Sequence, residues 1–226
     1  EILDIPMDNV ISGVTVLKEG KPVNSLFLVP YAGVDPVTGN ALYRKLDGTI
    51  TPTFSVADKV VYGTSDAPLF GAITTDLSYK GFDLSGQVNF FLDRQMYNND
   101  LSNLINPDYF TDNMHISVLN EWRTPGQITN VPRPSASGGN SYEAQTSRLL
   151  DDADFWRLRN VTLGYTVPAS ALDAVKIRAA RIFIQGQNLL TSTKFRGFDP
   201  EATGTSLTGA QYPALKQVTL GLTLGF

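Results

Sequence analysis

The sequence predicts an all-β chain whose antiparallel strands form part of a transmembrane β-barrel with long loops at one end. Three observations support this prediction. Several segments alternate apolar and polar residues with the period of 2 that a strand requires. The connections between these segments alternate between long and very short. The last segment, VTLGLTLGF, has the length of one tilted membrane-spanning strand.

Composition excludes several classes of protein. The 226 residues include 22 acidic and 18 basic ones, and no basic run, which argues against a nucleic-acid surface. The absence of cysteine excludes a disulfide framework, a thiolate nucleophile and a zinc ribbon. No apolar run reaches the roughly 18 residues of a membrane-spanning helix, but a barrel strand needs only about ten alternating residues.

Six strands are expected, over residues 23–31, 69–79, 82–92, 154–167, 177–190 and 214–226. The first is a short apolar run that ends near Pro30. The second and third form a hairpin around the turn Lys80-Gly81. The fourth ends at Pro168, because proline has no N–H to donate to the next strand. The fifth alternates less regularly, because Phe183 interrupts the pattern.

The predicted connections differ in length in a regular way. Residues 32–68, 93–153 and 191–213 are long, polar and rich in Gly, Pro, Asn and Asp, whereas the two remaining connections are short turns. Every second connection of an up-and-down antiparallel sheet lies at the same end, so all the long loops fall on one side. Outer-membrane barrels have this asymmetry, with short periplasmic turns and long extracellular loops. Phe226 is therefore expected at the periplasmic rim.

The last strand is expected to close the barrel against another strand, because an open edge in hydrocarbon costs several kcal/mol for each unsatisfied backbone group. Its apolar positions are predicted to face lipid: Val218, Leu220, Leu222, Leu224 and Phe226. Nine tilted residues span about 23 Å along the membrane normal, close to the apolar band of about 25 Å. Six strands cannot close a barrel, since the smallest have about eight, so the other strands must come from elsewhere.

Several motifs resemble the SusC/RagA-type TonB-dependent outer-membrane transporters. The stretch DDADFWRLRNVTLGYTVP resembles a signature near the end of that family, and IFIQGQNLLT, GFDPEATG and YPALKQVTLGLTLGF follow in the order of its penultimate strand, last outer loop and closing strand. YAGVDPVTGNALY, DGT, SYKGFDLS and EWRTPGQITNVPRP resemble upstream stretches. The resemblance implies a 22-stranded barrel of which residues 1–226 are the C-terminal portion, with the plug and the TonB box outside this chain.

The same resemblance implies a location, partners and an activity. The chain is expected in the bacterial outer membrane, in contact with the lipid bilayer, the remainder of the barrel and plug, and a SusD-like lipoprotein, with TonB bound through the absent N-terminal part. The implied activity is TonB-dependent uptake of oligosaccharides or peptides. A soluble β-sandwich that binds carbohydrate and a structural barrel subunit of an envelope complex are the alternatives, since a sandwich produces the same alternation.

The predicted loop over residues 93–153 carries the candidate contact residues. Tyr97, Tyr109, Trp122 and Tyr142 lie there among many short polar residues. Aromatic rings beside Asn, Asp and Ser suit sugar stacking, a polar protein interface or packing within the loop. We therefore expect these four residues to contact a ligand or the lipoprotein, or to hold the loop together.

Charged residues near the start of the fourth strand allow further predictions. Asp151, Asp152 and Asp154 offer oxygen ligands for Ca²⁺, but their spacing is not that of an EF-hand, and a solvated acidic strand start is the simpler interpretation. Arg157 and Arg159 share the parity of the lipid-facing residues that follow them. Because arginine costs about 2 to 4 kcal/mol at the bilayer midplane, we expect both at the extracellular rim.

Catalysis has little support in the sequence. His115 is the only histidine, and no nucleophile elbow, phosphate-binding glycine loop or metal-ligand cluster occurs. We therefore expect no enzyme activity, no catalytic or metal-binding residues and no cofactor, apart from a weak case for Ca²⁺ on the outer loops or the lipoprotein.

Overall fold

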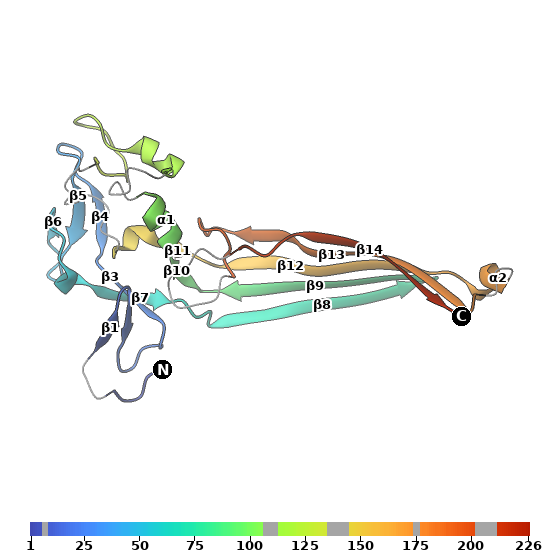
Figure 1. Ribbon diagram of the computed structural model, residues 1–226. Coiled ribbons are helices and arrows are strands. Elements are labelled where there is room, and N and C mark those ends of the chain that lie inside the picture. Colours follow the sequence, from blue (N-terminus) through green and yellow to red (C-terminus); the bar gives the residue numbers. More distant parts are fainter. Residues whose placement is uncertain (6–8, 106–112, 135–144, 174–176, 202–211) are drawn as a thin grey trace.

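The computed structural model describes residues 1–5, 9–105, 113–134, 145–173, 177–201 and 212–226. Figure 1 shows a long curved sheet, with a group of small sheets and short helices at one end. The C-terminus and helix α2 (Ala169–Leu172) lie at the opposite end of the long sheet. We call the long sheet the wall, the end with the small sheets its outer end, and the opposite end its inner end.

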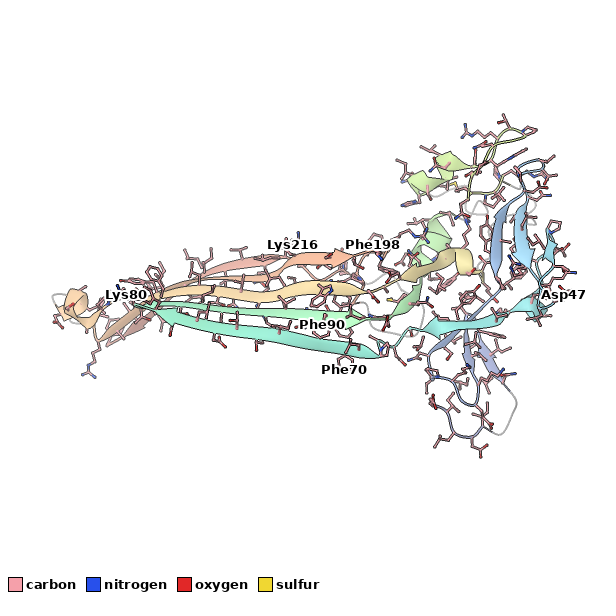
Figure 2. All side chains as sticks on the ribbon, turned by 180° about the vertical axis from the view of Figure 1, so that it is seen from behind. Asp47, Phe70, Lys80, Phe90, Phe198 and Lys216 are labelled. Atoms are coloured by element: carbon pink, nitrogen blue, oxygen red, sulfur yellow. The ribbon has the colours of Figure 1, made fainter. Side chains whose placement is uncertain are left out.

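The wall has five antiparallel strands in the order β14-β13-β12-β9-β8. Their bounds are Leu69–Tyr79 for β8, Phe82–Leu92 for β9, Phe155–Thr166 for β12, Ala179–Thr193 for β13 and Gln217–Gly225 for β14. β8 and β9 coincide with the predicted ranges 69–79 and 82–92, and the other three overlap the ranges 154–167, 177–190 and 214–226. Figure 2 places Lys80, in the β8–β9 turn, at the inner end.

The prediction of a sixth wall strand over residues 23–31 is wrong. This segment forms β3 (Ser25–Leu28), which belongs to a separate four-stranded sheet, β1-β2-β3-β7. The successive residues Ser25 and Leu26 are both buried, so both faces of β3 are covered, unlike a barrel strand with one face in lipid. Pro30 then ends the run, because it has no N–H to donate to a neighbouring strand.

The outer end contains the remaining short elements. The strands are β1 (Val10–Ser12), β2 (Thr15–Leu17), β4 (Tyr31–Val34), β5 (Ala41–Arg44), β6 (Ile50–Thr51), β7 (Val60–Thr64), β10 (Gln95–Tyr97) and β11 (Leu150–Asp152). The helices are α1 (Asn99–Leu104) and the 3-10 helices η1 (Val56–Asp58), η2 (Ile116–Asn120) and η3 (Ser147–Leu149). In the described ranges, no helix is long and apolar enough to cross a bilayer.

The predicted long connections are therefore folded around cores of their own. The largest cluster includes Leu26, Leu28, Tyr97, Leu101 and Leu149, which come from both the N-terminal segment and the 93–153 region. Segments far apart in sequence meet there, since Val29 of the first forms a bridge with Thr146 of the second. Burial of these side chains fixes the outer end as a packed body on top of the wall.

The two faces of the wall differ in chemistry. Cross-strand partners on one face form apolar rows, of which two are Leu77–Leu84–Leu163–Ile184–Leu220 and Tyr79–Phe82–Tyr165–Ile182–Leu222. The other face carries polar residues, including Thr74, Asp76, Ser85, Gln87, Asn89, Asn160, Thr162, Gln185 and Thr219. In a membrane barrel the apolar side faces lipid and the polar side faces the lumen, so we call them the outward and the inward face.

The terminal strand contributes to the outward face. By alternation, Val218 and Leu224 lie on the same side of β14 as the row residues Leu220 and Leu222. Leu220 is 72 % exposed, so nothing in the described part of the chain covers this face. A sandwich would place a second sheet there. Phe226, which follows β14, is also exposed.

A β-bulge at Arg159 changes which face the preceding residues occupy. Leu158 and Leu163 both pair with outward residues of β9, although they are an odd number of positions apart. Both can face outward only if β12 contains one extra residue between them. The register of β12 shifts between Leu158 and Asn160, so this extra residue is Arg159. Arg157 therefore lies on the inward face. Arg157 and Arg159 share the sequence parity of the outward residue Leu163, but the bulge breaks the alternation, so parity does not give the face of Arg157. Both arginines lie at the outer end of β12, as the predicted position at the extracellular rim requires.

Two glycines near the inner end make room for large inward side chains. Arg181 of β13 forms an ion pair with Asp83 of β9 across Gly164 of the intervening strand, where any side chain would collide with both partners. The ring of Phe183 lies over Gly221 of β14 in the same way. Phe183 interrupts the sequence pattern because it is a large apolar residue on the inward face.

Candidate functional site

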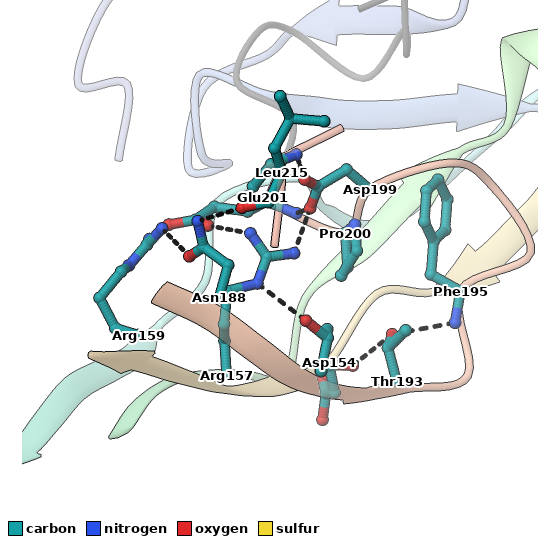
Figure 3. Close-up of polar contacts among 12 residues, drawn as sticks. Asp154, Arg157, Arg159, Asn188, Thr193, Phe195, Asp199, Pro200, Glu201 and Leu215 are labelled. Carbon is teal, nitrogen blue, oxygen red and sulfur yellow. Dashed lines mark hydrogen bonds and ion pairs between the residues drawn. The ribbon is translucent and has the colours of Figure 1, made fainter. Parts of the chain in front are cut away.

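The candidate site lies on the inward face at the outer end of the wall. We define the arginine clasp as Arg157, Arg159, Asp199 and Glu201. The two arginines come from the start of β12, and the two acidic residues come from the segment that follows β13 (Figure 3). The clasp therefore joins the last outer loop to the wall.

Arg157 is the centre of the clasp. Its side chain is only 4 % exposed. The guanidinium donates from Nη2 to Asp199 Oδ1 at 2.5 Å and from Nη1 to Glu201 Oε2 at 2.5 Å (Figure 3). Nε donates to Thr191 Oγ1 of β13 at 3.0 Å. Each nitrogen of this buried cation therefore has a partner, as burial of a charge requires.

Arg159 extends the clasp toward β13. It pairs with Glu201, and its Nη1 donates to Asn188 Oδ1 at 3.0 Å (Figure 3). Asn188 in turn donates from Nδ2 to the Leu215 carbonyl at 3.1 Å. Asn188 has a positive φ of 51°, a left-handed conformation that asparagine tolerates better than most residues. The bulged region of two strands thus holds both ends of the last outer loop.

Asp199 also closes the loop on itself. Its Oδ2 accepts the Ala214 N–H at 2.8 Å, and its Oδ1 accepts the Glu201 N–H at 2.9 Å. Burial by itself raises the pKa of the Asp199 carboxyl, but the hydrogen bonds from Arg157, Ala214 and Glu201 outweigh burial and hold the pKa below its ordinary value.

This low pKa predicts a loss of loop anchoring in acid. A carboxyl whose pKa is depressed in the folded state stabilises that state above its unfolded pKa, and the contribution is lost as the pH falls through the folded pKa. We expect the anchor to be complete above about pH 4 and to weaken progressively below it. Hydrogen exchange of residues 212–216, corrected for intrinsic rates, measures this. Asp199→Asn is the control, and pH-independent protection in the unaltered protein would contradict the prediction.

Arg94 connects the clasp to the preceding outer region. It is buried, and it donates from Nε to the Ser65 carbonyl at 2.8 Å and from Nη1 to the Pro200 carbonyl at 2.7 Å. Burial lowers its pKa, although the guanidinium stays charged. Pro200 lies between the two acidic residues of the clasp, so Arg94 holds the same segment from a second side.

Three phenyl rings continue the site across the inward face. Phe70, Phe91 and Phe155 are direct cross-strand partners on β8, β9 and β12. The Phe70 and Phe91 centroids are 5.7 Å apart, and those of Phe91 and Phe155 are 5.0 Å apart, with nearly parallel rings. We call these three residues the phenyl ladder. At one end of the ladder, Phe155 is buried, and the Arg157 guanidinium lies 5.4 Å from its ring centroid. At the other end, Phe70 is exposed.

Of the four predicted aromatic contact residues, the structure describes Trp122 and Tyr97, and these two lie in different surroundings. Trp122 lies against Gly39 in the β4–β5 turn, and its Nε1 donates to the Pro36 carbonyl at 3.0 Å. Tyr97 lies in the core of the outer end with its hydroxyl 3.4 Å from Ser102 Oγ, and burial raises its pKa to about 12. Of the roles expected for Tyr97, contact with a ligand or the lipoprotein is therefore wrong, because its ring fills the core, and packing within the loop agrees with the structure. Tyr109 and Tyr142 lie outside the described residues.

The aspartates considered for Ca²⁺ have other partners. Asp151 is buried and accepts from Arg196 Nε at 2.7 Å and from Asn98 Nδ2 at 2.9 Å. Asp154 accepts the Arg94 N–H at 2.9 Å. Asp152 and Asp154 also line a polar cavity of about 410 Å³. No cluster of three or more His, Cys, Asp or Glu side chains that could hold a metal occurs in the described part of the chain.

No pattern in the sequence distinguishes Asp199, Glu201 or Arg94 from other charged loop residues. The first two lie in the stretch GFDPEATG, which was noted only as part of the resemblance. Two arginines close together at the head of a strand indicate that acidic partners exist, but nothing in the sequence points to residues 42 positions away. The bulge that turns Arg157 inward was also hidden.

The fold and the site together define a class of protein. A single-layer antiparallel sheet with an apolar outward face, a polar inward face and packed loops at one end is the wall of a transmembrane β-barrel. The clasp lies where its outer mouth begins.

Comparisons with known proteins agree with this class. No protein-family model matches the chain. The TonB-dependent receptor P3 of Formosa agariphila is 29 % identical over 93 % of the chain and 23 % of the receptor. The TonB-dependent receptor SusC of Bacteroides thetaiotaomicron is 26 % identical over 92 % of the chain and 18 % of the receptor. The RagAB peptide transporter superposes with a TM-score of 0.86 and 30 % identity over 97 % of this chain and 25 % of that one.

These findings confirm the resemblance to SusC/RagA-type TonB-dependent receptors, and with it the antiparallel barrel fold and the location in the bacterial outer membrane. The chain spans between about a fifth and a quarter of the length of the relatives that it matches. All of these relatives are named as receptors or transporters.

Proposed function

We propose that the chain is the C-terminal part of the barrel of a TonB-dependent importer, which takes up oligopeptides or oligosaccharides together with a SusD-like surface lipoprotein. The likeness to the RagAB peptide transporter over nearly the whole chain carries this proposal. Relatives named as TonB-dependent receptors support coupling to TonB. The other proposed partners are the plug, the rest of the barrel and the lipid bilayer, and no cofactor on this chain is part of the proposal.

The inward face supports a path for a hydrated solute. Amides and hydroxyls, such as those of Gln87, Asn160 and Thr162, line it and can exchange hydrogen bonds with a passing polar molecule. The phenyl ladder near the outer mouth adds apolar rings, and its exposed end at Phe70 suits an apolar side chain of a peptide or the C–H face of a sugar.

Uptake by intact cells tests the proposed function. The gene for the full-length protein is deleted, and uptake of two labelled mixtures is measured: peptides from a protein digest and oligosaccharides from a polysaccharide digest. We expect one mixture to depend on the gene, on TonB and on the proton-motive force, and the gene on a plasmid to restore it. Unchanged uptake of both mixtures in the deletion strain would contradict the proposal.

Trp122 is proposed to pack the outer loops rather than to bind a ligand. Because its ring covers Gly39 and its indole nitrogen donates to Pro36, Trp122→Ala is expected to speed hydrogen exchange of residues 36–40. Ligand uptake and pull-down of the lipoprotein should remain unchanged. Leu119→Ala, at an exposed residue of the same region, is the matched control. Loss of the pull-down with unchanged exchange would instead make Trp122 a docking residue.

A further inference from the structure

We propose that the segment Phe198–Glu201 of the last outer loop forms a fixed constriction in the mouth of the barrel, with Arg157 as the positioning residue that holds it on the lumen side. The proposal adds a size-selecting element to the pore. It assigns a role to the arginine clasp, which the proposed function does not use.

Arg157 points to the lumen side of the wall. The bulge at Arg159 places Arg157 on the inward face, level with Asn89 of β9 and Thr191 of β13. Without the extra residue, the strict alternation of β12 would aim the guanidinium at lipid. The bulge therefore sets on which side of the wall the partners of Arg157 must lie.

The acidic partners of Arg157 lie on the same side of the wall. Asp199 and Glu201 each meet the Arg157 guanidinium at 2.5 Å, and that guanidinium lies over the inward ring of Phe155. A segment in contact with inward-facing groups at the rim lies over the lumen, not outside the barrel. Residues 198–201 of the last outer loop therefore lie in the mouth of the barrel.

Several independent contacts hold the segment there. Arg94 binds the Pro200 carbonyl from the outer end, and Ala214 binds Asp199 from the returning arm of the loop. Just before the segment, Arg196 pairs with the buried Asp151. The Arg157 side chain is almost completely buried in these contacts, and release of the segment would break both of its ion pairs at once, together with the ties from Arg94 and Ala214. Such an opening is rare, and the segment acts as a permanent part of the mouth.

A constriction in the mouth should limit which reagents can reach the lumen from outside the cell. Asn160 lies on the inward face immediately after the bulge, on the inner side of the clasp. This chain has no cysteine, so Asn160→Cys gives one reporter in a full-length protein whose other cysteines are replaced by serine. Intact cells are treated with a small charged maleimide or with a bulky polyethylene-glycol maleimide, and the two labelling rates are compared. Val37→Cys, at an exposed residue of the outer end, is the reference.

We expect the bulky reagent to label Asn160→Cys much more slowly than the small one, and to label Val37→Cys readily. Adding Arg157→Met should raise the ratio of bulky to small labelling at position 160 by at least about tenfold, because the variant removes the buried partner of two carboxylates. Arg157→Lys, which keeps the charge but not the fork of donors, should give an intermediate ratio. Arg123→Gln, which removes an exposed surface ion pair, should change nothing.

A second route protects the test against misfolding. The double variant Asp199→Asn with Glu201→Gln removes the two carboxylates on the loop side of the clasp and leaves the sequence of β12 unchanged. Gel mobility before and after heating shows whether its barrel is folded. An unchanged labelling ratio in this folded variant would overturn the constriction. Equal labelling by both reagents in the unaltered clasp, or labelling by neither in any variant, would also overturn it, since another element would then control the mouth. The labelling needs no transport, so failure of the proposed uptake would leave this result standing.

Discussion

Leu220→Arg is expected to prevent most of the full-length protein from reaching its folded, heat-modifiable form in the outer membrane. Leu220 lies near the middle of β14, in an outward row that runs across all five wall strands. An arginine facing lipid near the midplane costs about 2 to 4 kcal/mol. The folded fraction is measured by gel mobility of isolated outer membranes before and after heating.

The neighbouring residue gives a matched control for this effect. Thr219 precedes Leu220 on the same strand and faces inward, opposite Gln185. Thr219→Arg adds the same side chain to the polar face, so we expect a folded fraction close to that of the unaltered protein. An equal loss in the two variants would show that the outward face does not contact lipid.

Arg157→Met and Asp199→Leu are each expected to destabilise the full-length protein by about 3 to 5 kcal/mol, because each breaks the buried Arg157–Asp199 ion pair by removing one partner. The double variant should cost less than the sum of the two, with a coupling of at least about 1 kcal/mol. Urea-induced unfolding in detergent micelles, followed by gel mobility, gives the four free energies of the cycle.

The surface pair Arg123–Glu121 provides the comparison for this cycle. The Arg123 side chain is 63 % exposed, so water and salt screen the pair and its coupling should be close to zero. Additive effects at Arg157 and Asp199 would mean that the clasp stabilises the protein no more than a surface pair does.

The wall could be predicted from the sequence because each of its strands has two different surroundings. Thr219, Gly221 and Thr223 alternate with leucines, and such a period of 2 survives in any sheet with one apolar and one polar face. The prediction that residues 23–31 form a wall strand failed because both faces of this strand have the same kind of surroundings. Ser25 and Leu26 are both buried, and a strand covered on both faces has no alternation to distinguish it from a barrel strand.

The clasp could not be predicted, because it depends on two features that act over long distances. The bulge at Arg159 is visible only once β12 is in register with both neighbours, and it reverses the face that parity assigns to Arg157. The acidic partners arrive from a loop whose path is set by Arg94 and by the packing of the outer end. Charged residues in a loop follow no regular spacing along the sequence, so their positions in space are known only once the fold is known.

The two edge strands of the wall, β8 and β14, each have one side without a hydrogen-bonded neighbour in the described part of the chain. The five strands therefore cannot form a stable membrane structure by themselves. Within a bilayer each bare N–H and C=O group would cost several kcal/mol, which outweighs what five strands gain by themselves. A cell that makes only this stretch should therefore accumulate it as insoluble aggregates or degrade it. Biogenesis of the complete protein must bring both edges to their partners before the sheet enters hydrocarbon.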